Sequence, residues 1–151
     1  MPEIRQIIYS SQARKIFSPA ALLDLLGFCR QANPKAGLTG LLGHRDGTFL
    51  QLLEGPSEQV TRVIGRISAD VRHYDIRILA DRHVPERFFP DWSMGFEEVN
   101  EVALMAWPGL NHVLQPPRSS AEWANQPDLA LAYFDACRAD FQLSRTTAAK
   151  A

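Results

Sequence analysis

Short apolar runs alternate with helical patterns along the first hundred residues. Residues 4–9 (IRQIIY) combine β-branched and aromatic side chains in one short run, which predicts a strand. Ser18 followed by Pro19 is a typical helix start, and leucines at helical spacing come after it. We therefore expect a helix over about residues 19–32.

A hairpin, a second helix and two further strands are predicted next. The apolar segments within residues 37–55 are joined by Arg-Asp-Gly at 45–47, and Asp-Gly between such runs favours a hairpin. Pro56 opens a second helix, with valines and isoleucines on one face. Residues 76–84 and 92–96 predict a fourth and a short fifth strand. This βαββαββ order predicts an α+β, ferredoxin-like fold, with two helices on one face of a mixed five-stranded sheet.

The remainder of the chain differs in character. Prolines interrupt residues 98–118, and Pro127 opens an expected helix. The apolar stripe of that helix consists of Ala130, Tyr133, Phe134, Cys137 and Phe141. We expect one domain over residues 1–97 and a helical extension over 98–151, whose helices cover the other face of the sheet.

Composition and charge indicate a globular protein and give no sign of a nucleic-acid or membrane partner. The hydrophobic fraction is 46%, and 16 Lys and Arg against 17 Asp and Glu leave a net charge of −1. No basic stripe marks a nucleic-acid surface, and no apolar run is long enough for a membrane span or a signal peptide. Cys29 and Cys137 do not form a disulfide pattern, so we expect a cytoplasmic protein that binds neither nucleic acid nor membrane.

The sequence carries no motif for common enzymatic chemistry. GLTGLLG at residues 37–43 lacks the glycine order of a dinucleotide-binding loop. The four histidines have no metal-ligating spacing, and neither cysteine has a catalytic setting. We therefore expect no metal and no catalytic residues in the enzymatic sense.

Gln51 is unusual because it lies inside the apolar run TFLQLLEG, residues 48–55. Burying an amide without partners costs about 1–3 kcal/mol, so it needs hydrogen-bonding groups nearby. Strand alternation places Gln51 with Phe49 and Leu53, and Trp92 with Met94, so these side chains can converge with Tyr9. Each of these residues, taken singly, also has a purely structural interpretation. Tyr9 can be a half-buried strand residue, Met94 can fill space in the core, and Asn33 can cap the C-terminus of the first helix, just past its end.

Five separated motifs resemble the BLUF family, blue-light sensors that use flavin. They are IIYSSQA around Tyr9, NPKAGLTGLL from Asn33, DGTFLQLLEGP around Gln51, GRISADVRH around Arg66, and FPDWSMGF around Trp92 and Met94. Their order matches the family, and the resemblance covers residues 4 to about 97.

The resemblance implies a non-covalently bound flavin and a role for each matching position. FAD is the expected cofactor, with FMN or riboflavin as alternatives. Tyr9 corresponds to the electron- and proton-donating tyrosine, and Gln51 to the amide between that tyrosine and the flavin. Trp92 and Met94 share a segment whose inward-facing member is left open. The remaining cofactor contacts that the resemblance implies are Asn33, Arg66, Ile67 and Asp70; Ala32 departs from the His or Asn of some members.

The implied function is a light sensor in which Tyr9 donates to the flavin, the Gln51 amide rearranges, and the absorption shifts to the red. Its signal is expected to leave through the C-terminal region to a separate effector protein or through self-association, with no effector module in the chain. A small ferredoxin-like hydrolase of acyl phosphates or phosphate esters, without flavin, is the alternative, because this fold hosts many chemistries.

Overall fold

The computed structural model describes residues 4–15, 18–45 and 47–98, together with 128, 130–135 and 137–138. The elements in chain order are β1 (Ile4–Ala13), α1 (Pro19–Ala36), β2 (Thr39–Arg45), β3 (Thr48–Gly55), α2 (Ser57–Ala69), β4 (His73–Val84) and β5 (Gly95–Glu98). The predicted α+β class is confirmed, with a βαββαβ order and a short strand after it. In the described part of the chain, no helix is both long and apolar enough to cross a membrane.

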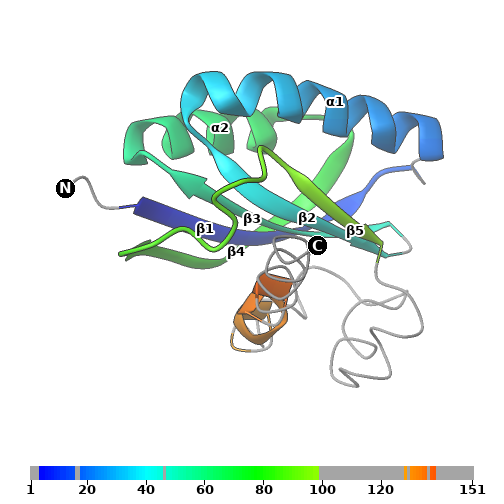
Figure 1. The fold of residues 1–151 in the computed structure, drawn as a ribbon. Coiled ribbons are helices and arrows are strands. Elements are labelled where there is room, and N and C mark those ends of the chain that lie inside the picture. Colours follow the sequence, from blue (N-terminus) through cyan, green and yellow to red (C-terminus); the bar gives the residue numbers. More distant parts are fainter. Residues whose placement is uncertain are drawn as a thin grey trace, which may run out of the picture.

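One sheet with the strand order β4-β1-β3-β2-β5 forms the centre of the fold. The pairs β4–β1, β1–β3 and β3–β2 are antiparallel, and β5 lies parallel to β2 at the edge. Helices α1 and α2 lie side by side on one face of this sheet (Figure 1). The tight link between β2 and β3 contains Gly47 at φ 85°, the positive φ that Gly supplies in hairpin turns.

Three elements are longer than the sequence predicts, and one of them is β4, which begins at His73 rather than at residue 76. Strand β1 continues past residue 9 to Ala13, because Ser11 and Gln12 keep their register opposite β3. Helix α1 continues past residue 32 to Ala36 and ends at Gly37, whose φ of 70° allows the left-handed cap. The N–H of Leu38 donates to the Asn33 carbonyl at 2.9 Å. Asn33 therefore lies in the last turn of α1 rather than just past the helix.

The two faces of the sheet build two separate apolar clusters. The helix-side cluster consists of Tyr9, Leu26, Leu42, Phe49, Leu53 and Met94. The far-side cluster consists of Ile8, Leu41, Leu50, Leu52, Phe89, Ala130, Tyr133 and Phe134. As predicted, alternation along β3 sends Phe49 and Leu53 to one face and Leu50 and Leu52 to the other.

A helical segment at residues 130–135 covers part of the far face, on the side of the sheet opposite α1 and α2 (Figure 1). Ala130, Tyr133 and Phe134 of the predicted stripe are buried in the far-side cluster, and Cys137 packs against it. Phe141 and the predicted segment 98–118, apart from residue 98, lie outside the described residues.

A buried carboxylate, Glu54 at the end of β3, anchors the segment that follows β4. The backbone N–H groups of Phe88 and Phe89 donate to its Oε1 and Oε2 at 2.8 and 2.7 Å. The Gln6 amide of β1 donates to Oε1 at 3.2 Å, and the Thr39 hydroxyl of β2 contributes a longer contact to Oε2 at 3.5 Å. Hydrogen bonds to a charged acceptor are strong, so Glu54 ties residues 88–89 to the middle of the sheet.

We expect Glu54→Ala to lower the free energy of unfolding by about 3 kcal/mol or more, because it leaves the two backbone N–H groups without their acceptor. Chemical denaturation of the full chain measures this. The control is Glu86→Ala, since Glu86 is 81% exposed and pairs with Arg138 at 3.7 Å. That change should cost no more than about 1 kcal/mol. Equal losses in the two variants would refute the anchoring role.

Candidate functional site

A pocket opens between α1, α2 and the helix-covered face of the sheet. Its lining residues are Tyr9, Ser11, Leu25, Cys29, Asn33, Leu42, Phe49, Gln51, Leu53, Val63, Ile67, Asp70, Arg72, His73 and Met94. Leu25 and Cys29 on α1 and Val63 and Ile67 on α2 give it apolar walls, while the polar side chains come mainly from the strands and the α2–β4 turn. Burial raises the pKa of the Cys29 thiol, so this wall is neutral.

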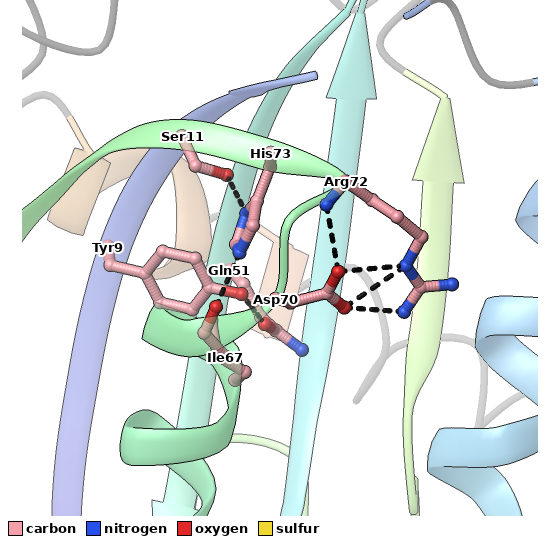
Figure 2. Close-up of polar contacts among 7 residues, drawn as sticks. All are labelled: Tyr9, Ser11, Gln51, Ile67, Asp70, Arg72 and His73. Carbon is pink, nitrogen blue, oxygen red and sulfur yellow. Dashed lines mark hydrogen bonds and ion pairs between the residues drawn. The ribbon is translucent and has the colours of Figure 1, made fainter. Parts of the chain in front are cut away.

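Tyr9 and Gln51 form the polar centre of the pocket. They are direct partners in the antiparallel pairing of β1 and β3, which places both side chains on the same face. The Tyr9 hydroxyl donates to Gln51 Oε1, and both residues are buried (Figure 2). Burial raises the pKa of Tyr9 well above its ordinary value, so the hydroxyl keeps its proton at neutral pH. The partner that the buried amide of Gln51 requires is therefore the tyrosine.

The other end of the Gln51 amide contacts Met94. Gln51 Nε2 lies 3.3 Å from Met94 Sδ, and Met94 is 2% exposed. Trp92 lies elsewhere: its ring stacks on Phe89 with centroids 5.9 Å apart, and it packs against the far-side cluster. The prediction that Trp92 and Met94 share one face is wrong, because β5 begins only at Gly95 and the chain turns between residues 89 and 92.

Helix α1 holds the backbone on either side of the Met94 side chain. Arg30 Nε donates to the Met94 carbonyl at 2.9 Å, and Asn33 Nδ2 donates to the Ser93 carbonyl at 2.5 Å. Arg30 and Asn33 are three residues apart and so lie on one side of the helix. Two side chains of α1 therefore fix the position from which Met94 reaches Gln51.

The turn after α2 forms a charged rim of the pocket. Asp70 accepts from Arg72 Nε at 3.0 Å and Nη2 at 2.6 Å, and from the Arg72 backbone N–H at 2.9 Å (Figure 2). Beside this pair, His73 Nε2 donates to the Ile67 carbonyl at 2.6 Å, and its Nδ1 lies 2.9 Å from the Ser11 hydroxyl. A carbonyl only accepts, so a neutral His73 carries its proton on Nε2 and accepts from Ser11.

The Asp70–Arg72 pair gives a pH prediction. The guanidinium of Arg72 lowers the pKa of Asp70 from 3.8 to about 2. A lowered pKa in the folded state means that the pair contributes to stability above about pH 4 and loses that contribution as the pH falls from 3.8 towards 2. We expect the stability difference between the wild type and Asp70→Asn to be constant from neutral pH to about pH 5 and to vanish near pH 2.

Denaturation at a series of pH values, with a carboxyl titration by NMR, measures this dependence. The Asp75→Asn variant is the control, because Asp75 pairs with Arg77 on β4, away from the pocket. A titration of Asp70 at its ordinary pKa would contradict the pairing.

Most of the residues singled out from the sequence meet in this one pocket. Six of them line it, namely Tyr9, Asn33, Gln51, Ile67, Asp70 and Met94, whereas Trp92 and Arg66 do not. Sequence reasoning passed over Arg72 and His73, although both belong to the motif GRISADVRH. The sequence signal that could have indicated Arg72 is its spacing, two residues after Asp70 in a turn, because oppositely charged side chains at this spacing can form an ion pair.

Comparison with known proteins assigns the chain and its fold to a family. The sequence profile of the BLUF family, described as sensors of blue-light using FAD, matches residues 4–95. The dark-state structure of the BLUF protein BlrB has a TM-score of 0.67 and 30% identity, covering 86% of this chain and 98% of that one. The photo-activated state of BlsA has a TM-score of 0.72 and 28% identity, covering 87% and 91%.

Curated relatives combine the same region with much longer chains. Photoactivated adenylate cyclase subunit beta of Euglena gracilis is 35% identical over 72% of this chain, which spans 12% of that protein. The blue light- and temperature-regulated antirepressor BluF of Escherichia coli (strain K12) is 34% identical over 55% of this chain and 21% of its own length. The predicted family is confirmed: the chain belongs to the BLUF family of blue-light sensors that use flavin.

Proposed function

We propose that this protein is a blue-light photoreceptor in which Tyr9 and Gln51 switch the hydrogen bonds around a flavin bound non-covalently in the pocket. The observation that carries this proposal is the buried chain from the Tyr9 hydroxyl to the Gln51 amide to the Met94 sulfur. Such a chain has one amide at its centre, with an acceptor at one end and two donors at the other. Rotation of that amide changes its contacts with the Tyr9 hydroxyl and with the Met94 sulfur at the same time.

The pocket suits an isoalloxazine ring, which is flat, apolar on its faces and polar along one edge. Apolar side chains of α1 and α2 stand on opposite sides, where they can contact the two faces of the ring. Asn33, Gln51, Asp70 and Arg72 supply donors and acceptors for its edges. We expect Ile67 to contact a ring face, and FAD, FMN or riboflavin to fit the same pocket.

The flavin, when bound, supplies the absorption of blue light and an excited state that accepts an electron and a proton. Tyr9 releases the electron from its ring and the proton from Oη, which in the dark donates to Gln51 Oε1. While that proton is away, the Gln51 amide is free to rotate or tautomerise. When both the electron and the proton have returned to Tyr9, its hydroxyl meets a different end of the amide, and the altered donor pattern shifts the absorption to the red.

Residues 88–94 offer a route for the signal, because they contact both faces of the sheet. Met94 lies against Gln51 on the helix side, while Phe89 and the stacked Trp92 pack with the cluster that contains Tyr133 and Phe134. A rearranged Gln51 loses or changes its contact with Met94 Sδ. We propose that this displaces the segment, alters the packing of residues 130–135, and changes self-association or binding to a separate effector protein.

The test of the photoreceptor function is purification of the full chain, identification of the released flavin, and absorption spectra in the dark, under blue light and after return to darkness. We expect a yellow protein with a small reversible red shift. A colourless protein that takes up no flavin would overturn the proposal and favour the ferredoxin-like hydrolase.

Hydrogen exchange in the dark and under light tests the signal route. We expect light to lower the protection of residues 88–95 and of residues 130–138, while protection in β1 and β3 changes little because these strands lie in the middle of the sheet. The control is the Gln51→Leu chain, in which light should change nothing. Equal protection of both segments in the two states, with unchanged oligomer size, would refute the route.

A further inference from the structure

Three aromatic side chains form a continuous row that begins two residues before Met94. Trp92 stacks on Phe89, with ring centroids 5.9 Å apart and an interplanar angle of 14°. The Phe89 ring meets the Phe88 ring edge to face, with centroids 6.3 Å apart. Packed side chains leave little free space between them, so a shift of residues 92–94 displaces the Phe88 ring through direct contacts.

Two guanidinium groups lie over the Phe88 ring at the end of this row. Arg138, which is helical and follows the segment 130–135, has its Cζ 4.6 Å from the ring centroid, and Arg82 of β4 has its Cζ 5.6 Å away. Arg138 also pairs with Glu86 at 3.7 Å, and its side chain is 27% exposed. A cation within about 6 Å of the centroid is attracted to the face of an aromatic ring, more strongly where water is partly excluded. A ring contact and an ion pair therefore bind Arg138 to the start of the segment 86–94.

The two arginines differ in how they are held. Arg82 Nε donates to Gln6 Oε1 at 2.9 Å, and the Gln6 amide donates to Glu54, which also accepts from the backbone N–H of Phe88. Arg82 is thereby fixed to the sheet, whereas the Arg138 side chain has no comparable anchor in the described part of the chain. Two positive charges near one ring also repel each other. A displacement of the Phe88 ring therefore weakens its contact with Arg138 first.

From this arrangement we propose that Arg138 and Phe88 form a latch that holds the end of the C-terminal helical segment on the far face in the dark and opens in the lit state. A cation–π contact and a partly exposed ion pair are weak beside the buried side chains of Tyr133 and Phe134. The latch can therefore open while the apolar part of the segment stays packed. The latch in the dark does not depend on a flavin, whereas its opening by light rests on the proposed function.

A double-mutant cycle on the full chain in the dark tests the latch, with the hydrogen exchange of residues 130–138 as the readout. We expect Arg138→Gln to speed this exchange about fivefold, because it removes the cation over the Phe88 ring. In a Phe88→Leu background, which lacks the ring, the same change should have less than about a twofold effect. Arg138→Lys keeps the cation and should speed exchange less than Arg138→Gln. The latch is refuted if Arg138→Gln has no effect, if its effect is as large without the ring, or if the Lys and Gln variants exchange equally.

The control is Arg14→Gln, which breaks a contact of the same kind, since Arg14 Cζ lies 5.3 Å from the centroid of the Tyr74 ring, outside the far-side cluster. It should leave the exchange of residues 130–138 as in the wild type.

The same exchange measured under blue light tests the opening of the latch. Arg138→Gln should keep a red shift of full amplitude, because Arg138 contacts Phe88 at the far-side cluster, away from the pocket. Its exchange at residues 130–138 should respond to light less than in the wild type, since the latch is already open. A light response as large as in the wild type would overturn the opening by light. Absence of any red shift in the wild type would instead refute the photoreceptor function, and the cycle in the dark would still decide whether the latch exists.

Discussion

The Gln51→Leu variant is expected to bind flavin but to lose the light-induced red shift completely. Leucine keeps the apolar bulk of the side chain and removes both the acceptor for Tyr9 Oη and the donor to Met94 Sδ. The Tyr9 hydroxyl is then left without its acceptor in a buried place, which costs about 1–3 kcal/mol of stability. The apolar walls from α1 and α2 are unchanged, so the ring should still be held. Absorption spectra before and after blue light, at matched flavin content, measure the effect.

Gln12→Leu is the matched control, because Gln12 is also a strand glutamine and also accepts a side-chain hydrogen bond, from Thr48 at 3.1 Å, but does not line the pocket. It should keep a red shift of full amplitude. If Gln51→Leu shows the same red shift as the wild type and as this control, the amide is not the switch and the assignment fails.

The Tyr9→Phe variant is expected to stop the photocycle and to raise flavin fluorescence. Phenylalanine retains the ring in the helix-side cluster but lacks the hydroxyl proton and is much harder to oxidise. Without the transfer from Tyr9, the excited flavin loses its main route of decay and emits instead. The variant should fold, because the loss of a single hydroxyl from a hydrogen-bonded pair costs about 1 kcal/mol. Fluorescence yield and the light-minus-dark spectrum are the two readouts.

Tyr74→Phe makes the same chemical change at a tyrosine on β4 that is 45% exposed and outside the pocket. Its fluorescence and photocycle should match those of the wild type. A photocycle of normal amplitude in Tyr9→Phe would show that the electron and proton come from another side chain.

The positions of Tyr9 and Gln51 at the centre of the site could be predicted because both follow from the alternation of side chains along a β-strand. A side chain on every second residue of β1 and β3 faces the helices, so Tyr9 and Gln51 are placed by the same alternation that buries Phe49 and Leu53. The sequence predicts Asn33 just past the first helix, whereas it lies in the last turn of α1, and this difference has a physical cause. Pro34 suggests a helix end, but Gly37 supplies the cap three residues later and keeps Asn33 in α1.

The segment around Met94 could not be predicted in the same way. Treating residues 92–96 as a strand puts Trp92 and Met94 on one face, whereas a turn at residues 89–92 sends them to opposite faces. The position of this segment depends on contacts distant in sequence, from Glu54, Arg30 and Asn33. The partnership of Asp70 with Arg72 is likewise set by the turn after α2, which carries no periodic signal.

The most direct test of the switch is an infrared difference spectrum between the lit and dark states of the full chain, recorded with and without isotope label in the glutamine side-chain amides. Rearrangement of Gln51 predicts difference bands that move with the label in the wild type. These bands should be absent in Tyr9→Phe, which cannot start the transfer. A light-induced red shift accompanied by difference spectra that are identical with and without the label would contradict the account, because the flavin would then respond to light while the Gln51 amide stays unchanged.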